Sequence, residues 1–65
     1  MNAEKRTVRH LQPGNVLNGS GETVIWVGRG VRTPQGKMEV VLKKGPIRRL
    51  AIWGASTTVS IKVPA

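Results

Sequence analysis

Three apolar segments separated by two turn signals fill the middle of this chain, and they limit what it can form. Each is short enough to be a β-strand, and together they span residues 23–32, 37–44 and 47–53. Between the first two, Pro34 presets φ and Gly36 supplies the left-handed conformation that closes a hairpin. Gly45-Pro46 turns the chain again before the third segment. The stretch therefore predicts a three-stranded antiparallel meander.

Two further strands are predicted outside the meander. Residues 15–18 form a short one after a Pro-Gly turn, and residues 57–63 alternate cleanly between apolar and polar positions. Strands that recur about every ten residues, with turn signals between them, indicate an all-β sandwich or barrel. At 65 residues, one bent sheet that closes on itself is easier to fill than two sheets, and closure removes exposed edges. We expect a five-stranded, mostly antiparallel barrel over residues 8–65.

The chain before this barrel is mostly charged. Residues 1–7 are expected to form a flexible basic arm, although a short helix over residues 3–11 is an alternative. Leu11 is expected to pack on the core. Gly28 and Gly30 lie inside the first segment and predict a bulge or sharp bend there.

Alternation along each strand predicts which side chains face the core. The second segment places Met38, Val40 and Leu42 on one face, and the last strand places Val59, Ile61 and Val63 inward. In the first segment, Ile25, Val27 and Val31 share the aliphatic face. In the third segment, Leu50 and Ile52 form the aliphatic face, with Ala51 and Trp53 opposite. Trp26 and Trp53 thus fall on the face opposite the aliphatic residues of their own strands.

The segment Leu11–Leu17 reads Leu-Gln-Pro-Gly-Asn-Val-Leu. It resembles the Leu-x-Pro-Gly-(Asp/Asn) pattern at the start of the first strand of SH3-like small barrels, including KOW-type nucleic-acid-binding modules. The order of strands and turns over residues 8–63 is also similar. The resemblance implies an SH3-like barrel; many such barrels bind DNA or RNA and others bind peptides, so fold does not decide function. The chain departs from peptide-binding SH3 domains because it has no Tyr or Phe and no acidic loop. It also resembles the small basic proteins common in bacteriophage genomes.

Charge is the strongest indication of function. Eleven Lys and Arg face three acidic residues, which gives a net charge of +8. Such a field attracts polyanions, so we expect a small nucleic-acid-binding protein that contacts mainly phosphates, is weakly sequence-specific and prefers DNA to RNA. The alternatives are solubility alone, an anionic membrane surface, a module that binds an acidic protein (a host factor, if the source is a phage), or a self-associating structural protein.

The basic residues of the meander are the candidate phosphate-binding groups, and they are expected to gather in two foci, one at each end of the strands. With one residue of the last strand they comprise Arg29, Arg32, Lys37, Lys43, Lys44, Arg48, Arg49 and Lys62. Trp26 and Trp53 are the only aromatic residues, and an exposed one beside arginines could stack on a base. Alternatively, both tryptophans complete the core.

Catalytic and metal-binding patterns are missing from the sequence. It has no Cys, no Asp and a single histidine, His10, so neither a metal-ligand set nor a Ser-His-Asp triad can be assembled. Glu22 and Glu39 are expected to be solvated charges. We expect no enzymatic activity and no cofactor.

The chain shows no apolar run long enough for a signal peptide or a membrane helix, the longest being Val24–Val27. We therefore expect a cytoplasmic protein without a membrane partner, located in the host cytoplasm or nucleoid if phage-encoded. A monomer or a small homo-oligomer is expected.

Overall fold

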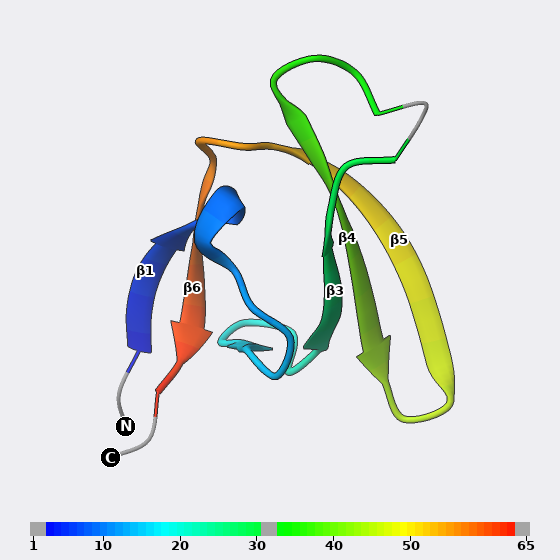
Figure 1. The fold of residues 1–65 in the computed structure, drawn as a ribbon. Helices are drawn as coiled ribbons and strands as arrows, with labels where there is room; N and C mark the ends of the chain where they lie inside the picture. The colour runs from blue at the N-terminus through cyan, green and yellow to red at the C-terminus, as the bar shows by residue number, and fades with distance from the viewer. Residues whose placement is uncertain (1–2, 31–32, 64–65) are drawn as a thin grey trace.

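A computed structural model describes residues 3–30 and 33–63 of the chain as one antiparallel β-sheet (Figure 1). Its elements are β1 (Ala3–Thr7), the 3₁₀ helix η1 (Val8–His10), β2 (Val16–Leu17), β3 (Thr23–Gly28), β4 (Lys37–Lys44), β5 (Ile47–Gly54) and β6 (Thr58–Lys62). Neighbouring strands follow the order β1-β6-β2-β3-β4-β5. The protein is therefore all-β, and none of its described helical segments is long and apolar enough to cross a membrane.

The predicted five-stranded closed barrel is wrong in two respects. The described residues form six strands, and the sheet is open, with β1 and β5 at its two edges. The additional strand is β1, which pairs with β6 from Ala3↔Lys62 to Thr7↔Thr58. The expected flexible arm over residues 1–7 is thus a strand from residue 3 onward; residues 1–2 lie outside the described part. Nothing in the polar sequence of β1 indicated a strand, because its order comes from its partner β6.

The central meander is confirmed. β4 has the predicted bounds, and Gly36 and Gly45 adopt the left-handed φ values of 79° and 60° that the two turns require. A positive φ at Gly45 followed by Pro46 fits a two-residue type II′ hairpin turn. The first strand ends at Gly28 instead of continuing to Arg32, and residues 31–32, which include Val31, lie outside the described part.

A β-bulge in β3 changes the expected orientation of Val24 and Ile25, whereas Val27 packs on the core and Trp26 faces the opposite side, as alternation predicted. Val24 is paired with Leu42, but Val41 is paired with Trp26, so Ile25 is an additional residue between two regular pairs. The bulge lies here and not at the glycines where a bend was expected. Val24 consequently points into the core and is completely buried, whereas Trp26 points away from it. The expectation that Ile25 lies with Val27 on the core face is wrong for this reason.

The orientation of β5 also differs from expectation. Its residues alternate as predicted, but Ala51 is the buried one because it is paired with the buried Val40 of β4. Leu50 and Ile52 therefore face solvent, although they were assigned to the aliphatic face. The register of β5 against β4 determines which of its faces is buried, because paired residues of neighbouring strands point to the same side of a sheet.

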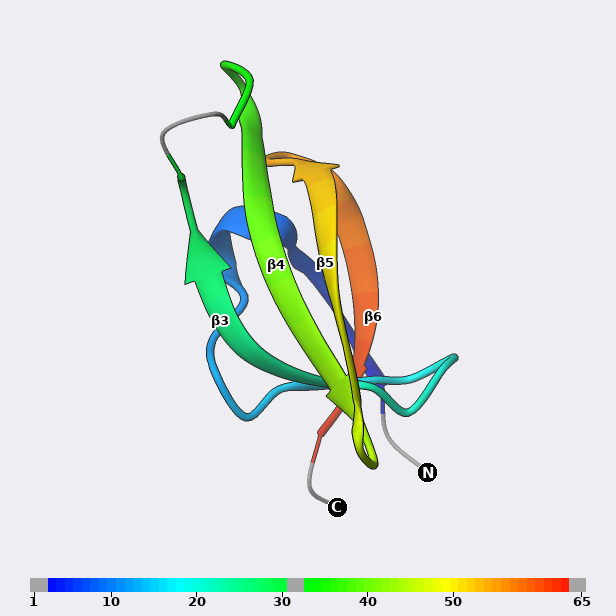
Figure 2. The same cartoon turned by 90° about the vertical axis from the view of Figure 1, so that its right-hand side faces the viewer.

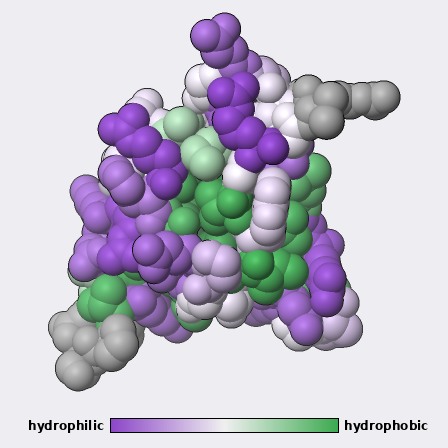
Figure 3. Space-filling view, viewed as in Figure 1, coloured by the Kyte–Doolittle hydropathy of each residue, from purple (hydrophilic) through white to green (hydrophobic). Residues whose placement is uncertain are grey.

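The sheet is strongly curved, so β6 lies behind β4 and β5 when the molecule is seen from the side (Figure 2). The core fills the concave side and consists of Val8, Leu11, Leu17, Val24, Val40, Leu42, Ala51 and Ile61. Val27, Met38, Trp53, Val59 and Val63 are partly buried against it. The inward positions expected in β4 and β6, and the burial of Leu11, are confirmed. Apolar side chains remain visible in the middle of the surface, with hydrophilic ones at the sides (Figure 3).

Leu42 and Leu50 offer a direct test of this orientation, because they lie on neighbouring strands in opposite environments. Leu42 is completely buried and Leu50 is 57% exposed. Leu42→Ala is expected to lower the free energy of unfolding by about 2–5 kcal/mol, through lost burial and a cavity. Leu50→Ala should change it by about 0.5 kcal/mol or less. Urea denaturation measures both values, and equal losses would contradict the assigned orientation of β5.

Candidate nucleic-acid interface

Two of the predicted phosphate-binding residues hold the β4–β5 hairpin to the turn before β3. The Arg49 guanidinium donates two hydrogen bonds to the Glu22 carboxylate, from Nε to Oε2 at 2.6 Å and from Nη2 to Oε1 at 2.8 Å. Lys44 Nζ donates to the backbone oxygen of Ser20 at 2.8 Å. The Ser20 hydroxyl donates to Glu22 Oε1 at 3.0 Å and accepts the Glu22 backbone N–H at 3.2 Å. Arg49 and Lys44 therefore have a structural role.

Glu22 is not the solvated charge that the sequence suggested. Its side chain is only 12% exposed, and the hydrogen bonds from Arg49 lower the pKa of Glu22 to about 2, with Ser20 and the positive charge of Lys44 acting in the same direction. The same contact raises the pKa of Arg49. A carboxylate held in this way accepts charge-assisted hydrogen bonds, which are stronger than neutral ones. The turn and the hairpin tip are thus locked together.

The convex side of the meander carries a mixed apolar and basic surface, which we call the outer face. Strand pairing aligns Trp26, Val41 and Leu50 in one row across three strands, with Lys43–Arg48 and Glu39–Ile52 as the neighbouring β4–β5 pairs. These seven residues define the outer face. Trp26, Leu50 and Ile52 are all at least 40% exposed. The bulge and the register of β5 together place them there.

Trp26 lies over Gly28, and only a glycine accommodates it. A Cβ atom at position 28 would lie 2.7 Å from indole atom Cζ2 and 2.8 Å from Cη2, closer than side chains approach. The indole therefore rests on the backbone of Gly28, while 43% of the residue remains exposed to solvent. This arrangement presents an aromatic surface with one supported side.

Lys43 and Arg48 form a cross-strand pair beside the aromatic row. Side chains paired in this way have Cβ atoms about 5 Å apart, and the next pair on the same face follows after about 7 Å. Among residues 3–30 and 33–63, neither cation has a hydrogen-bond or ion-pair partner. Both side chains are exposed. The pair is therefore free to meet an anion in the row adjacent to that of Trp26, whose indole leans the other way, over Gly28.

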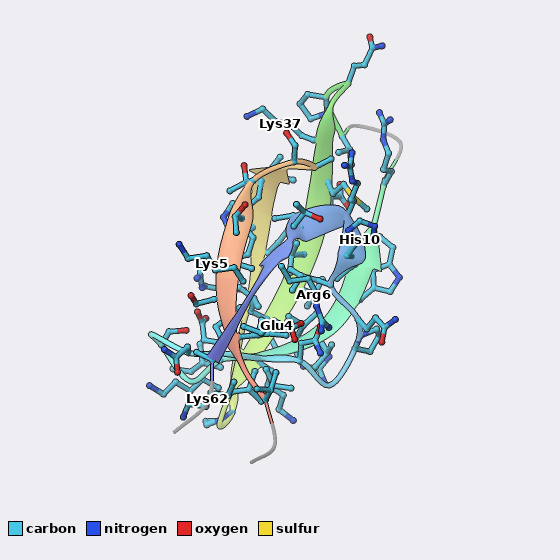
Figure 4. The ribbon with its side chains drawn as sticks, turned by 90° about the vertical axis from the view of Figure 1, so that its left-hand side faces the viewer. Glu4, Lys5, Arg6, His10, Lys37 and Lys62 are labelled. Carbon is cyan, nitrogen blue, oxygen red and sulfur yellow. The ribbon has the colours of Figure 1, made fainter. Side chains whose placement is uncertain are left out.

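Of the remaining predicted cations, Arg29 and Lys37 lie at the far end of β4, whereas strand pairing through Thr23 and Val16 places Lys62 at the same end of the sheet as Lys43. Lys37 is paired with Gly54 at the far end of the β4–β5 ladder, about 20 Å from Lys43 by strand length. Arg29 follows β3 at that same end, where its Nη2 lies 3.5 Å from the Thr33 carbonyl oxygen. Lys62 and Lys37 lie at opposite ends of the molecule (Figure 4). Arg32 lies outside the described residues. The structure thus brings together Lys43 and Arg48, with the structural pair Lys44 and Arg49 close by.

The two tryptophans have different environments. Trp53 is paired with Met38 and packs against the core, whereas Trp26 is exposed on the outer face. Only Trp26 is placed to stack on a ligand. The contribution of Leu50 and Ile52 to the outer face was missed by the sequence reasoning, since no local signal reveals the register of β5.

Comparison of the chain with protein-family models, curated proteins and solved structures finds no match. The described part of the molecule has no pocket and no cluster of three or more His, Asp or Glu side chains that could hold a metal ion. The outer face is accordingly the candidate site on geometric grounds.

The Glu22–Arg49 contact predicts a pH dependence of stability. The pKa of Glu22 is about 2 in the folded protein and near the ordinary 4.5 when unfolded, so the carboxylate stabilises the fold fully above pH 4.5. That contribution is lost as pH falls from 4.5 toward 2, because the unfolded chain binds the proton first. Thermal unfolding of Glu22→Gln should therefore show a weaker decline of Tm over this range than the native protein. Glu4→Gln makes the same charge change on β1 and serves as control; an equal effect of both variants would contradict the assignment.

Proposed function

We propose that the protein binds nucleic acid on the outer face, with phosphates on Lys43 and Arg48 and an unpaired base stacked on Trp26. One observation carries the proposal: Trp26, exposed on the outer face and packed over Gly28, belongs to the cross-strand row adjacent to the unengaged cations Lys43 and Arg48. DNA is the proposed ligand, and the net charge of +8 supports a polyanion of this kind. The binding is dominated by phosphate contacts and is weakly sequence-specific.

Stacking favours a single strand. Base–aromatic stacking is tolerant of sequence because every base has a π-face, and it contributes about 1–3 kcal/mol per base. The bases of a duplex already stack on one another, so Trp26 has no access to them without unpairing. The separation of about 7 Å between neighbouring side-chain pairs on one face of a strand suits a base and an adjacent phosphate. Val41 and Leu50 extend the apolar contact beside the indole.

The SH3-like resemblance supports the same proposal. The resemblance rested on the order of strands and turns along the chain, and β2, β3, β4, β5 and β6 follow one another in that order after the Leu11–Leu17 segment begins. We propose a relation to these small barrels that includes nucleic-acid binding but not closure of the sheet. A bacteriophage origin is also a proposal, and it is based on the resemblance of the chain to the small basic proteins of bacteriophages.

The rival hypothesis, a module for an acidic protein or for self-association, was tied to exposure of both tryptophans and of Val24. Trp53 is partly buried against the core and Val24 is completely buried, so the two tryptophans and Val24 do not form one exposed patch. The apolar surface that does exist contains Trp26, Leu50 and Ile52, and Trp26 suits a base as well as a side chain.

Trp26 is the residue whose replacement tests stacking. Trp26→Ala should weaken binding of a single-stranded oligonucleotide by about 5- to 150-fold, the equivalent of 1–3 kcal/mol, and Trp26→Phe should retain most of the affinity. Leu50→Ala, an exposed apolar neighbour, is the matched control and should have a smaller effect. Fluorescence anisotropy of a labelled oligonucleotide measures all three. Unchanged affinity in Trp26→Ala would remove the stacking site.

Salt dependence tests the phosphate contacts. Each phosphate contact on a single strand contributes about −0.7 to the slope of log K against log salt. The double replacement of Lys43 and Arg48 by Ala should therefore flatten that slope by about 1.4 and leave the fold intact, because exposed charges contribute little to stability. Lys37→Ala at the far end of β4 is the control for loss of one charge.

A titration of the native protein with both single-stranded and duplex oligonucleotides decides the function as a whole. Affinity in the micromolar range at physiological salt is expected for the single strand. Affinity weaker than millimolar at low salt for both ligands would refute the proposed function.

A further inference from the structure

β5 is an edge strand whose composition differs from that of the opposite edge. It spans eight residues, has no proline and pairs with β4 without a bulge along its whole length. Four consecutive residues within it, Leu50-Ala51-Ile52-Trp53, are apolar. At the other edge, β1 carries Glu4, Lys5 and Arg6 in succession, the kind of charged edge that discourages further pairing. Of the two edges, only β5 offers an unprotected apolar stretch.

The backbone of β5 has hydrogen-bonding groups directed away from the sheet. In a two-residue hairpin, the flanking pair Lys44↔Ile47 exchanges both ladder bonds, and bonded pairs then alternate along the strands. Arg48, Leu50 and Ile52 fall on the alternate positions, so their N–H and C=O groups point to the open side. Within the described residues, no strand lies there. An additional strand could therefore bond to these three residues.

Side chains and charge indicate which strand would fit. Leu50 and Ile52 stand on the outer face next to the open edge, and Arg48 follows them toward the hairpin tip. A new strand would place apolar residues opposite the first two and a carboxylate opposite Arg48. The direction follows from Arg48 and Lys43, because both cations lie at the hairpin-tip end of this edge. β5 has no acidic residue of its own.

We propose that the edge of β5 binds an extended, acidic segment of a partner protein as an additional β-strand, with its acidic end at Lys43 and Arg48. This binding mode is separate from nucleic-acid binding, although both ligands use Arg48 and should compete. A second copy of the chain is the less suitable occupant, because each copy carries a net charge of +8 and would repel the other. An acidic strand satisfies both the backbone groups and the charge.

The probe is an acetylated and amidated peptide of sequence Thr-Thr-Val-Thr-Val-Thr-Glu-Glu. Laid antiparallel to β5, it places its valines opposite Ile52 and Leu50 and a glutamate opposite Arg48. One control peptide carries N-methyl groups on both valines, whose N–H groups would bond to β5. Another carries them on its second and sixth residues, which are threonines whose N–H groups would point away from β5. A third replaces both glutamates by lysine. Binding is followed by the amide chemical shifts of ¹⁵N-labelled protein.

The unmodified peptide is expected to bind at least tenfold more tightly than the valine-methylated peptide and the lysine peptide, and to shift the amides of Arg48, Leu50 and Ile52. Methylation of the two threonines should have little effect. Leu50→Lys, an exposed substitution that spares the core, should weaken binding, and Lys5→Ala on the β1 edge should not. Each of these readouts is independent of any oligonucleotide, so failure of the nucleic-acid proposal leaves this test intact.

Three results would overturn the inference. Equal binding of the unmodified and valine-methylated peptides would mean that charge alone holds the peptide. No shift at millimolar peptide would mean that the edge does not accept a strand. A concentration-dependent dimer in sedimentation equilibrium that Leu50→Lys abolishes would assign the β5 edge to a second copy instead.

Discussion

The single extra residue in β3 determines which side chains this sheet buries and which it presents. Without the bulge at Ile25, strict alternation would place Val24 and Trp26 on the same face of the strand. With it, Val24 enters the core opposite Leu42, and Trp26 turns outward opposite Val41. The opposite orientations of Val24 and Trp26 are therefore consequences of this one local irregularity. Bulges commonly re-aim side chains next to functional sites.

The basic residues divide into those that hold the molecule together and those that remain accessible. Arg49 and Lys44 bind Glu22 and the Ser20 carbonyl, and in doing so fix the hairpin tip that carries Lys43 and Arg48. The net charge therefore overestimates how many basic residues can contact a ligand, because residues adjacent in sequence, such as Arg48 and Arg49, have different roles. Alternation explains the division: Arg49 shares the face of Leu42, where Glu22 lies, and Arg48 shares the face of Lys43.

An open sheet of this size leaves more surface unpaired than a barrel would. The curvature of the sheet encloses a small core, which η1 helps to cover through Val8. The two edge strands differ in composition, because β1 carries charged residues and β5 carries apolar ones. The outer face and the β5 edge meet at Arg48, so the proposed ligands of the protein, a polyanion and an acidic strand, converge on the same cation. The two proposed ligands are therefore expected to compete for Arg48.

The sequence by itself determined the class of fold and most of the central strands. Proline and glycine at fixed turn positions marked both hairpins, β4 was predicted residue by residue, and clean alternation identified β6. These features are encoded in local sequence patterns, so a local reading is sufficient to predict them. The candidate cations were also named from sequence, including Lys43 and Arg48.

Only the tertiary structure decided the rest, because it depends on pairing between distant segments. β1 is ordered by β6, more than fifty residues away along the chain. The outward orientation of Leu50 follows from the register of β5 against β4, and the burial of Val24 follows from the bulge in β3. The sheet has open edges because β1 and β5, its two outermost strands, do not pair with each other. A side chain's neighbours across a sheet are set by register, and register is a property of two strands together rather than of either sequence alone.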